Sequence, residues 1–273
     1  MDIFLETLHD TYLIFPILFI MYLFLEYFEH KNENLKYTPL LSRYGPLLGA
    51  FFGLIPQCGF GVLASMLFIE NKLTLGTLIS VYIATSDEAI PILIAYPEQY
   101  QCLVFIIIIK LILAIFTGYI VDYFFKNNHF SYHLDESKHK HHSSFIIDSF
   151  IRAAKIYTVI FIINFILSFA IDWIGTDKLS LLLFNQSLMQ PIVSAIFGFI
   201  PHCASSVILT QLHIHQVLSF SSLLAGLITN AGLGILVLLQ NRVNTKMILK
   251  ICIILFISAL LVSLPLQWFQ FLS

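Results

Sequence analysis

Two stretches of the chain carry the same order of proline, a polar residue and cysteine. Residues 53–58 read GLIPQC, and residues 198–203, 145 positions later, read GFIPHC. Thiolate and imidazole groups bind zinc-like and softer metal ions, whereas carbonyl and carboxylate oxygens suit harder ones. Proline inside an apolar segment also interrupts a helix and leaves backbone groups free. The two motifs therefore predict an ion site at a pair of helix breaks, with packed helix kinks as the plainer alternative.

Polar residues also interrupt a neighbouring apolar stretch. They are Thr85, Ser86, Asp87 and Glu88, and Pro91 follows them. Where such a stretch crosses a membrane, acidic side chains at depth are costly and are functional by default, as ion ligands or proton carriers. Lys110 lies in the next apolar stretch, and an ion pair with Asp87 or Glu88 would hold it there. This lysine could carry the coupling charge or could only neutralise an acid.

The matching place in the second half has no acid. It contains Thr229 and Asn230, and a one-residue gap would set Thr85 and Ser86 over them. The predicted metal site is lined by Gln57, Cys58, Thr85, Ser86, Asp87, Glu88, His202, Cys203, Thr229 and Asn230. Pro56 and Pro201 lie at the two predicted helix breaks, which are the tips of the helical hairpins described below. These residues mix soft and hard ligands, so the sequence does not decide between zinc-like ions and manganese or magnesium.

A histidine-rich loop separates the two halves. His139, His141 and His142 could collect a metal ion, or they could belong to a solvated linker. His213 and His215, just after the second hairpin, could act in the same way on the other side of the membrane.

The composition places the whole arrangement in a lipid bilayer. Of 273 residues, 58% are hydrophobic and 11% are charged, against roughly 25% charged in soluble domains. No basic residue precedes the first apolar run, so this run is expected to be retained rather than cleaved as a signal peptide. A net charge of −2 with no basic, aromatic patch gives no reason to expect nucleic acid as a partner. No cofactor is expected beyond the ion at the predicted site, and the oligomeric state is left open.

Segment lengths predict an all-α polytopic fold. Full spans take about 20 residues, and they are expected at 11–29, 73–95, 101–125, 150–173, 217–239 and 247–269. Shorter apolar arms at 44–56 and 58–69 reach only about 20 Å as helices, less than the roughly 30 Å of hydrocarbon. They predict a re-entrant hairpin, and the region 179–214 predicts a second one.

Five segments in each half predict an inverted repeat. The first membrane repeat would be residues 1–126, the histidine-rich cytoplasmic loop 127–144, and the second repeat 145–273. An odd number of segments makes the second half enter the membrane from the opposite side, as in many secondary transporters. Most lysines and arginines then fall on one side of the membrane, which predicts that the histidine-rich loop is cytoplasmic and that both termini are external.

The motif sequences resemble those of a known family. Residues 56–93 (PQCGFG through ATSDEAIP) and residues 198–239 (GFIPHC through AGLITNAGLG) are similar to bacterial heavy-metal exporters with ten membrane segments. Members of that family are labelled manganese transporters or arsenic efflux proteins. The resemblance covers nearly the whole chain and implies efflux of a metal or metalloid ion. The matching residues are Pro56, Gln57, Cys58, Thr85, Ser86, Asp87, Glu88, Pro201, His202, Cys203 and Asn230.

The leading hypothesis is a secondary transporter coupled to protons or another ion. The chain has no GxxxxGK[ST] loop, so direct ATP drive by this chain is not expected. One alternative is an intramembrane enzyme that uses His202 with Cys203 or Cys58. Adjacent residues on one backbone usually face different ways, which disfavours such a pair. A metal-sensing channel is the other alternative.

Overall fold

The computed structural model describes residues 16, 19, 39–55, 58–85, 89–125, 150, 154, 157–158, 161–162, 189–241 and 243–272. All regular structure in these residues is helical and none of it is strand, which agrees with the predicted all-α class. The predicted spans at 11–29 and 150–173, the proposed domain boundaries and the histidine-rich loop lie wholly or mostly outside the described residues.

The helices of the two halves correspond almost residue for residue. In the first half they are α3 (Pro39–Gly53), α4 (Cys58–Ile69), α5 (Leu75–Ala84), α6 (Ala89–Ala95), the 3₁₀ turn η1 (Pro97–Gln99) and α7 (Tyr100–Phe124). In the second half they are α10 (Gln190–Gly198), α11 (Cys203–Ile214), α12 (Phe220–Thr229), α13 (Gly234–Gln240) and α14 (Thr245–Leu272). From α4 onward, each helix begins 145 residues before its counterpart, and α3 and α10 end with the same offset.

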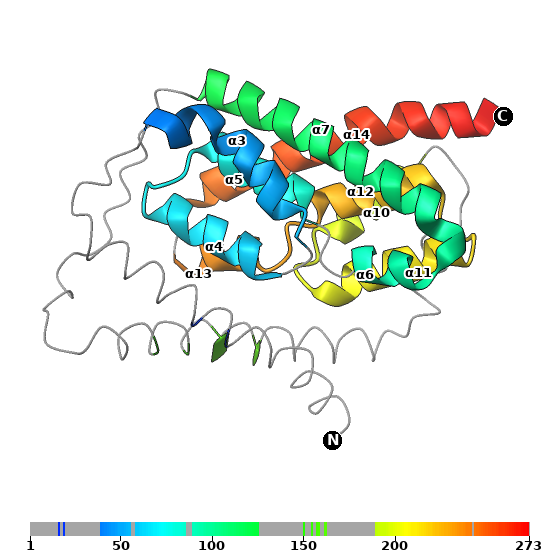
Figure 1. The fold of residues 1–273 in the computed structure, drawn as a ribbon, viewed down its shortest axis with the longest axis horizontal. Coiled ribbons are helices and arrows are strands. Elements are labelled where there is room, and N and C mark those ends of the chain that lie inside the picture. Colours follow the sequence, from blue (N-terminus) through cyan, green and yellow to red (C-terminus); the bar gives the residue numbers. More distant parts are fainter. Residues whose placement is uncertain are drawn as a thin grey trace, which may run out of the picture.

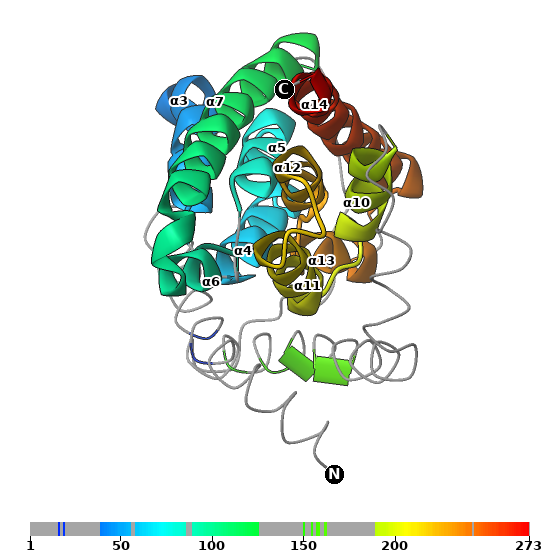
Figure 2. The same ribbon diagram turned by 90° about the vertical axis from the view of Figure 1, so that its right-hand side faces the viewer.

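Two short helices form the centre of the bundle. Every residue of α5 is buried, as is every residue of α12 after the half-buried Phe220, and the two helices pack against each other. Figure 2 shows them surrounded by the other helices. In contrast, the long helices α7 and α14 expose large apolar side chains such as Phe116, Leu261 and Phe269. Such a surface suits lipid and not water.

Counterpart helices run in opposite directions along the long axis of the molecule. Figure 1 shows the chain running right to left through α7 and left to right through α14. Contacts at the two ends agree with this view. The Nζ atom of Lys250, early in α14, lies 5.7 Å from the ring centre of Phe125, just after α7. At the opposite end, Cys102 at the start of α7 contacts His213 in α11.

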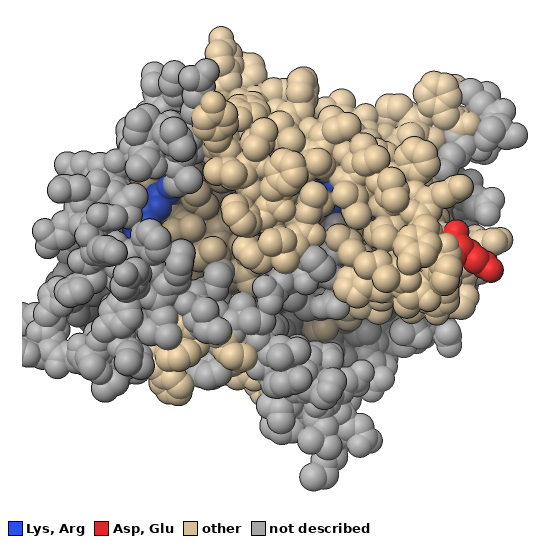
Figure 3. Space-filling view, viewed as in Figure 1, with Lys and Arg blue, Asp and Glu red and all other residues tan. Residues whose placement is uncertain are grey.

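Four helical stretches of the described chain are long and apolar enough to cross a membrane. They are Leu75–Ala95, Pro97–Phe124, Phe220–Gln240 and Thr245–Phe269. They correspond to the predicted spans 73–95, 101–125, 217–239 and 247–269, and they support these four predictions. Between the two ends, the described surface visible in Figure 3 carries almost no charge. The chain is therefore consistent with a multi-pass membrane protein.

The first turns of the two central helices are capped by their own N-cap residues and by side chains from the long helices. Thr74 and Ser219 are the N-caps of α5 and α12, and each hydroxyl accepts a hydrogen bond from the N–H three residues later. Asp122 of α7 accepts hydrogen bonds from Thr74 Oγ1 at 2.7 Å and from Gly76 N at 2.8 Å. Gln267 of α14, the counterpart of Asp122, accepts a hydrogen bond from Ser219 Oγ at 2.7 Å. These caps satisfy helix-end donors that lipid cannot satisfy.

Helix α4 packs against a helix of the other half. Helix α4 contacts α13, where Gly61 and Gly234 bring the two backbones close together. Ser65 Oγ lies 2.6 Å from Tyr82 Oη and 3.0 Å from the carbonyl oxygen of Gly234. Small residues that allow close approach, joined by a hydroxyl between helices, are typical of packing within membranes. This contact ties α4, α5 and α13 together.

The α4–α13 contact predicts unequal effects of two alanine substitutions. A Cβ added at Gly234 would lie 2.6 Å from Tyr82 Cε1 and 2.9 Å from the carbonyl oxygen of Gly61. The nearest atom to a Cβ at Gly61 would be 3.6 Å away, an ordinary contact. Gly234→Ala should lower the free energy of unfolding by about 1–3 kcal/mol, because the helices must separate. Thermal unfolding of the purified protein measures the loss, and Gly61→Ala is the matched control. Equal stability of the two variants would contradict the packing described.

Candidate functional site

Two helices stop in the buried centre of the bundle. Helix α5 ends at Ala84, and the next described helix, α6, begins at Ala89. In the second half, α12 ends at Thr229 and α13 begins at Gly234. The C-caps are Thr85 and Asn230, both non-helical and both buried. Each break leaves helix-end carbonyl groups far from water, where they need a partner.

Lys110 supplies that partner for both halves at once. It lies near the middle of α7 and is fully buried. Its Nζ atom donates hydrogen bonds to the carbonyl oxygen of Thr85 at 2.5 Å and to that of Leu227 at 2.8 Å. Thr85 caps α5, and Leu227 lies in the last turn of α12. A cation is favoured at the negative end of a helix dipole, and here one ammonium group serves two such ends.

The hydroxyl groups at the breaks are occupied within the protein. Thr85 Oγ1 donates to the carbonyl oxygen of Val81 at 2.8 Å, one turn back in the same helix. Thr229 Oγ1 donates to the carbonyl oxygen of Ala195 in α10 at 2.7 Å. The side-chain oxygen of Asn230 accepts a hydrogen bond from Gly232 N at 3.0 Å, and Gly232 has a φ of 55°. The Asn230 amide therefore stabilises the turn between α12 and α13.

The structure refines one expectation about the second half and corrects another. The span expected at 217–239 is present as Phe220–Gln240, but the chain leaves the helix at Asn230 and turns through Gly232 before α13. The one-residue gap between the halves was wrong. Because α5 and α12 begin and end with the same offset of 145 residues, Thr85 corresponds to Asn230, and Ala84 corresponds to Thr229.

His202 has a definite role at the start of α11. It is the N-cap of α11, and its Nδ1 atom accepts a hydrogen bond from Ala204 N at 2.9 Å. In a neutral ring, Nε2 then carries the proton and acts as a donor. Metal binding through Nε2 would require this tautomer to change. Ligation by His202 stays a prediction, and Pro201, half-buried beside it, remains the expected tip residue.

Several predicted site residues lie outside the part of the chain that the structure describes. Outside the described residues are Pro56, Gln57, Ser86, Asp87, Glu88, His139, His141 and His142. The backbones of Cys58 and Cys203 begin α4 and α11, but their side chains are also outside the description. The structure thus brings Thr85, Lys110 and the end of α12 together. The pairing of Lys110 with Asp87 or Glu88 stays a prediction.

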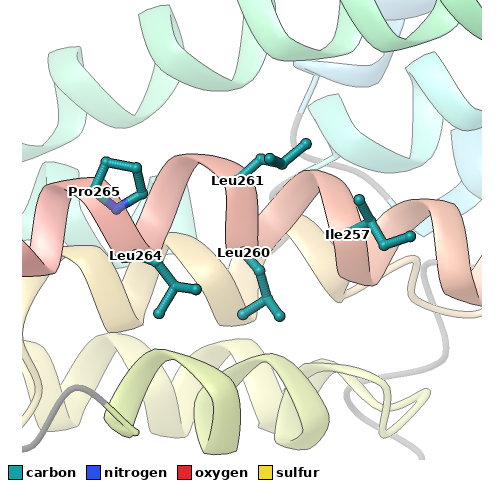
Figure 4. A pocket seen from close by; sticks show the side chains of 5 residues that line it. All are labelled: Ile257, Leu260, Leu261, Leu264 and Pro265. Carbon is teal, nitrogen blue, oxygen red and sulfur yellow. The ribbon is translucent and has the colours of Figure 1, made fainter.

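A surface groove elsewhere has no part in this site. It is lined by Ile257, Leu260, Leu261, Leu264 and Pro265, all on α14 (Figure 4). Ile257 and Leu261 are more than half exposed on the outer side of the bundle. An apolar groove on a lipid-facing helix offers no ligand for an ion.

The contacts of Lys110 predict a stability loss that a surface lysine would not show. Lys110→Met should lower the free energy of unfolding by about 1–3 kcal/mol, because two buried carbonyl groups lose their donor. Lys250→Met is the control, since this exposed lysine only covers a phenyl ring and should cost less than about 1 kcal/mol. Chemical unfolding in detergent measures both variants. A Lys110→Met protein as stable as the parent would contradict the role assigned to this ammonium group.

Comparison with known proteins gives one match. Residues 1–173 match the model of a family described as "Putative, 10TM heavy-metal exporter". No curated protein and no solved structure matches the chain. The matched region covers more than half of the sequence and includes the break between α5 and α6 and Lys110. It confirms the resemblance seen in the first motif, residues 56–93, while the second motif, residues 198–239, lies outside the matched region. The chain belongs to this family, described as heavy-metal exporters with ten membrane segments.

Proposed function

We propose that the chain is a secondary membrane transporter that exports a metal or metalloid ion by alternating access. The substrate class is a manganese-like divalent cation or arsenite. The observation that carries this proposal is the meeting of two broken helices, one from each half, at the buried ammonium group of Lys110. Broken helices that meet at mid-depth are how many secondary transporters build their ion sites.

The proposed architecture is an inverted repeat of five plus five segments. Its support is the constant offset of 145 residues between counterpart helices and the opposite directions of α7 and α14. Helices α4 and α11 have 12 residues each, so each is about 18 Å long. This is too short to cross the bilayer, which favours α3–α4 and α10–α11 as opposed re-entrant hairpins.

The proposed ion site lies at the first helix break. Thr85 and Ala89, on either side of Ser86, Asp87 and Glu88, are both buried. Acids in this stretch would bind a cation or, in its absence, protons, and Lys110 would provide a nearby positive charge. Exchange of the cation for protons at Asp87 and Glu88 would couple export to the proton gradient. Gln57, Cys58, His202 and Cys203 at the hairpin tips are proposed to complete the lining.

Contacts between the halves suggest how access could alternate. Helix α4 of the first half packs on α13 of the second, and α11 of the second packs on α6 of the first. Each hairpin therefore lies beside the outer part of the other half's broken helix. A rocking motion of the halves would open one of these contacts while the other stays closed.

The proposed setting is a bacterial plasma membrane with both termini outside. In this topology the loop with His139, His141 and His142 is cytoplasmic, where it could collect the metal ion before export.

The proposal predicts that one carboxylate is essential for export. Asp87→Asn keeps the size of the side chain but cannot carry the charge that balances a cation, so cells should lose at least about tenfold in efflux, equivalent to about 1.4 kcal/mol. The measurement is intracellular Mn, Zn and arsenic content, together with resistance to each. Glu98→Gln is the control, because Glu98 is exposed in η1 at the end of the bundle. Unchanged metal content and resistance in Asp87→Asn cells would refute the proposal.

A further inference from the structure

A cysteine and a histidine from different halves face each other at one end of the bundle. Cys102 lies in the first turn of α7, and His213 lies in the last turn of α11. The Sγ atom of Cys102 and the Nε2 atom of His213 are 3.4 Å apart. Both side chains are half-buried, so they are held in place yet remain within reach of solvent. On α7, Cys102 lies eight residues before Lys110, which is about 12 Å along the helix axis.

The other ring nitrogen of His213 is already engaged. Nδ1 lies 2.8 Å from the carbonyl oxygen of Leu218, a group that can only accept, so Nδ1 must carry the proton. Nε2 then presents its lone pair to the sulfur of Cys102. Histidines that bind metals usually have this arrangement, with the second nitrogen donating to a carbonyl group that fixes the tautomer and the ring orientation.

The separation of the two atoms fits a shared ion. A zinc-type ion binds sulfur at about 2.3 Å and nitrogen at about 2.0 Å, which at a tetrahedral angle holds the two atoms about 3.5 Å apart. The observed 3.4 Å therefore needs almost no rearrangement. On binding, the thiol would lose its proton to solvent, and the thiolate and imidazole would each give one ligand.

The fold itself does not require a polar pair at this position. The counterparts in the other half, 145 residues away, are Phe68 in α4 and Met247 in α14, and both are buried and apolar. The same helix positions can thus be filled by apolar side chains. Cys102 and His213 thus place a thiol and an imidazole where the described counterpart positions have apolar side chains.

We propose that Cys102 and His213 form a binding site for a borderline or soft divalent cation such as Zn²⁺ or Cd²⁺. Thiolate with imidazole selects such ions over Mn²⁺ and Mg²⁺, which prefer oxygen ligands. Two protein ligands leave the remaining positions to water, so the ion is held loosely and exchanges. If the proposed transport function holds, this site would bind a thiophilic substrate ion, such as Cd²⁺ or Zn²⁺, at the external end.

The test is protection of Cys102 from alkylation. The purified full-length protein is treated with N-ethylmaleimide with or without Cd²⁺ or Zn²⁺, and each cysteine is read separately by peptide mass spectrometry. At an ion concentration ten times the dissociation constant, alkylation of Cys102 should slow about tenfold. Cys252, a half-buried cysteine in α14, is the internal control and should react at the same rate throughout. Mn²⁺ should give no protection.

Two variants separate metal binding from a simple hydrogen bond. His213→Gln retains an N–H donor for Leu218 but has no imidazole, so protection of Cys102 should disappear. Asp87→Asn should keep full protection, because it alters the proposed transport site and leaves this pair intact. Protection that persists in His213→Gln, or its absence in the parent protein, would show that the pair is only a hydrogen bond between α7 and α11. Normal protection with no export by the parent would instead refute the transport function alone.

Discussion

Backbone carbonyl groups at the ends of two broken helices are the constraint on which this structure depends. In a bilayer they have no water to bind, so the protein must supply donors. Lys110 does this for both halves, with hydrogen bonds to Thr85 and Leu227. A buried ammonium group is itself costly without compensation, and two helix C-termini provide part of it. The buried centre of the bundle thereby contains a polar contact that joins the two halves.

The same requirement explains why α5 and α12 have the same geometry at their outer ends. Asp122 binds the first turn of α5, and Gln267 binds the first turn of α12, each from the long lipid-facing helix that lies outside it. The carboxylate of Asp122 complements the positive end of the helix dipole, whereas the amide oxygen of Gln267 accepts hydrogen bonds without adding a charge. The two halves thus share their geometry while differing in charge. A similar asymmetry separates Cys102 and His213 from their apolar counterparts Phe68 and Met247.

The sequence predicted the positions of helix breaks where a strong local signal was present. The GLIPQC and GFIPHC motifs marked the start of α4 and α11, and the acidic run with Pro91 marked the end of α5. The break after α12 was missed, since Asn230 and Gly232 lie in an apolar stretch and give a weaker signal. Partners of buried polar groups were also out of reach. The carbonyl oxygen of Leu227 has no signature in the sequence, and Cys102 and His213 are 111 positions apart.

The most direct test of the central claim is to locate the transported ion. An experimental structure of the full-length protein with a bound metal ion, phased on the anomalous signal of Mn²⁺ or Cd²⁺, would show where it lies. We predict a peak within coordination distance of Asp87 or Glu88, beside the break between α5 and α6 and close to Lys110. A fully occupied, transport-competent protein whose metal peaks all lie away from both helix breaks would contradict this account.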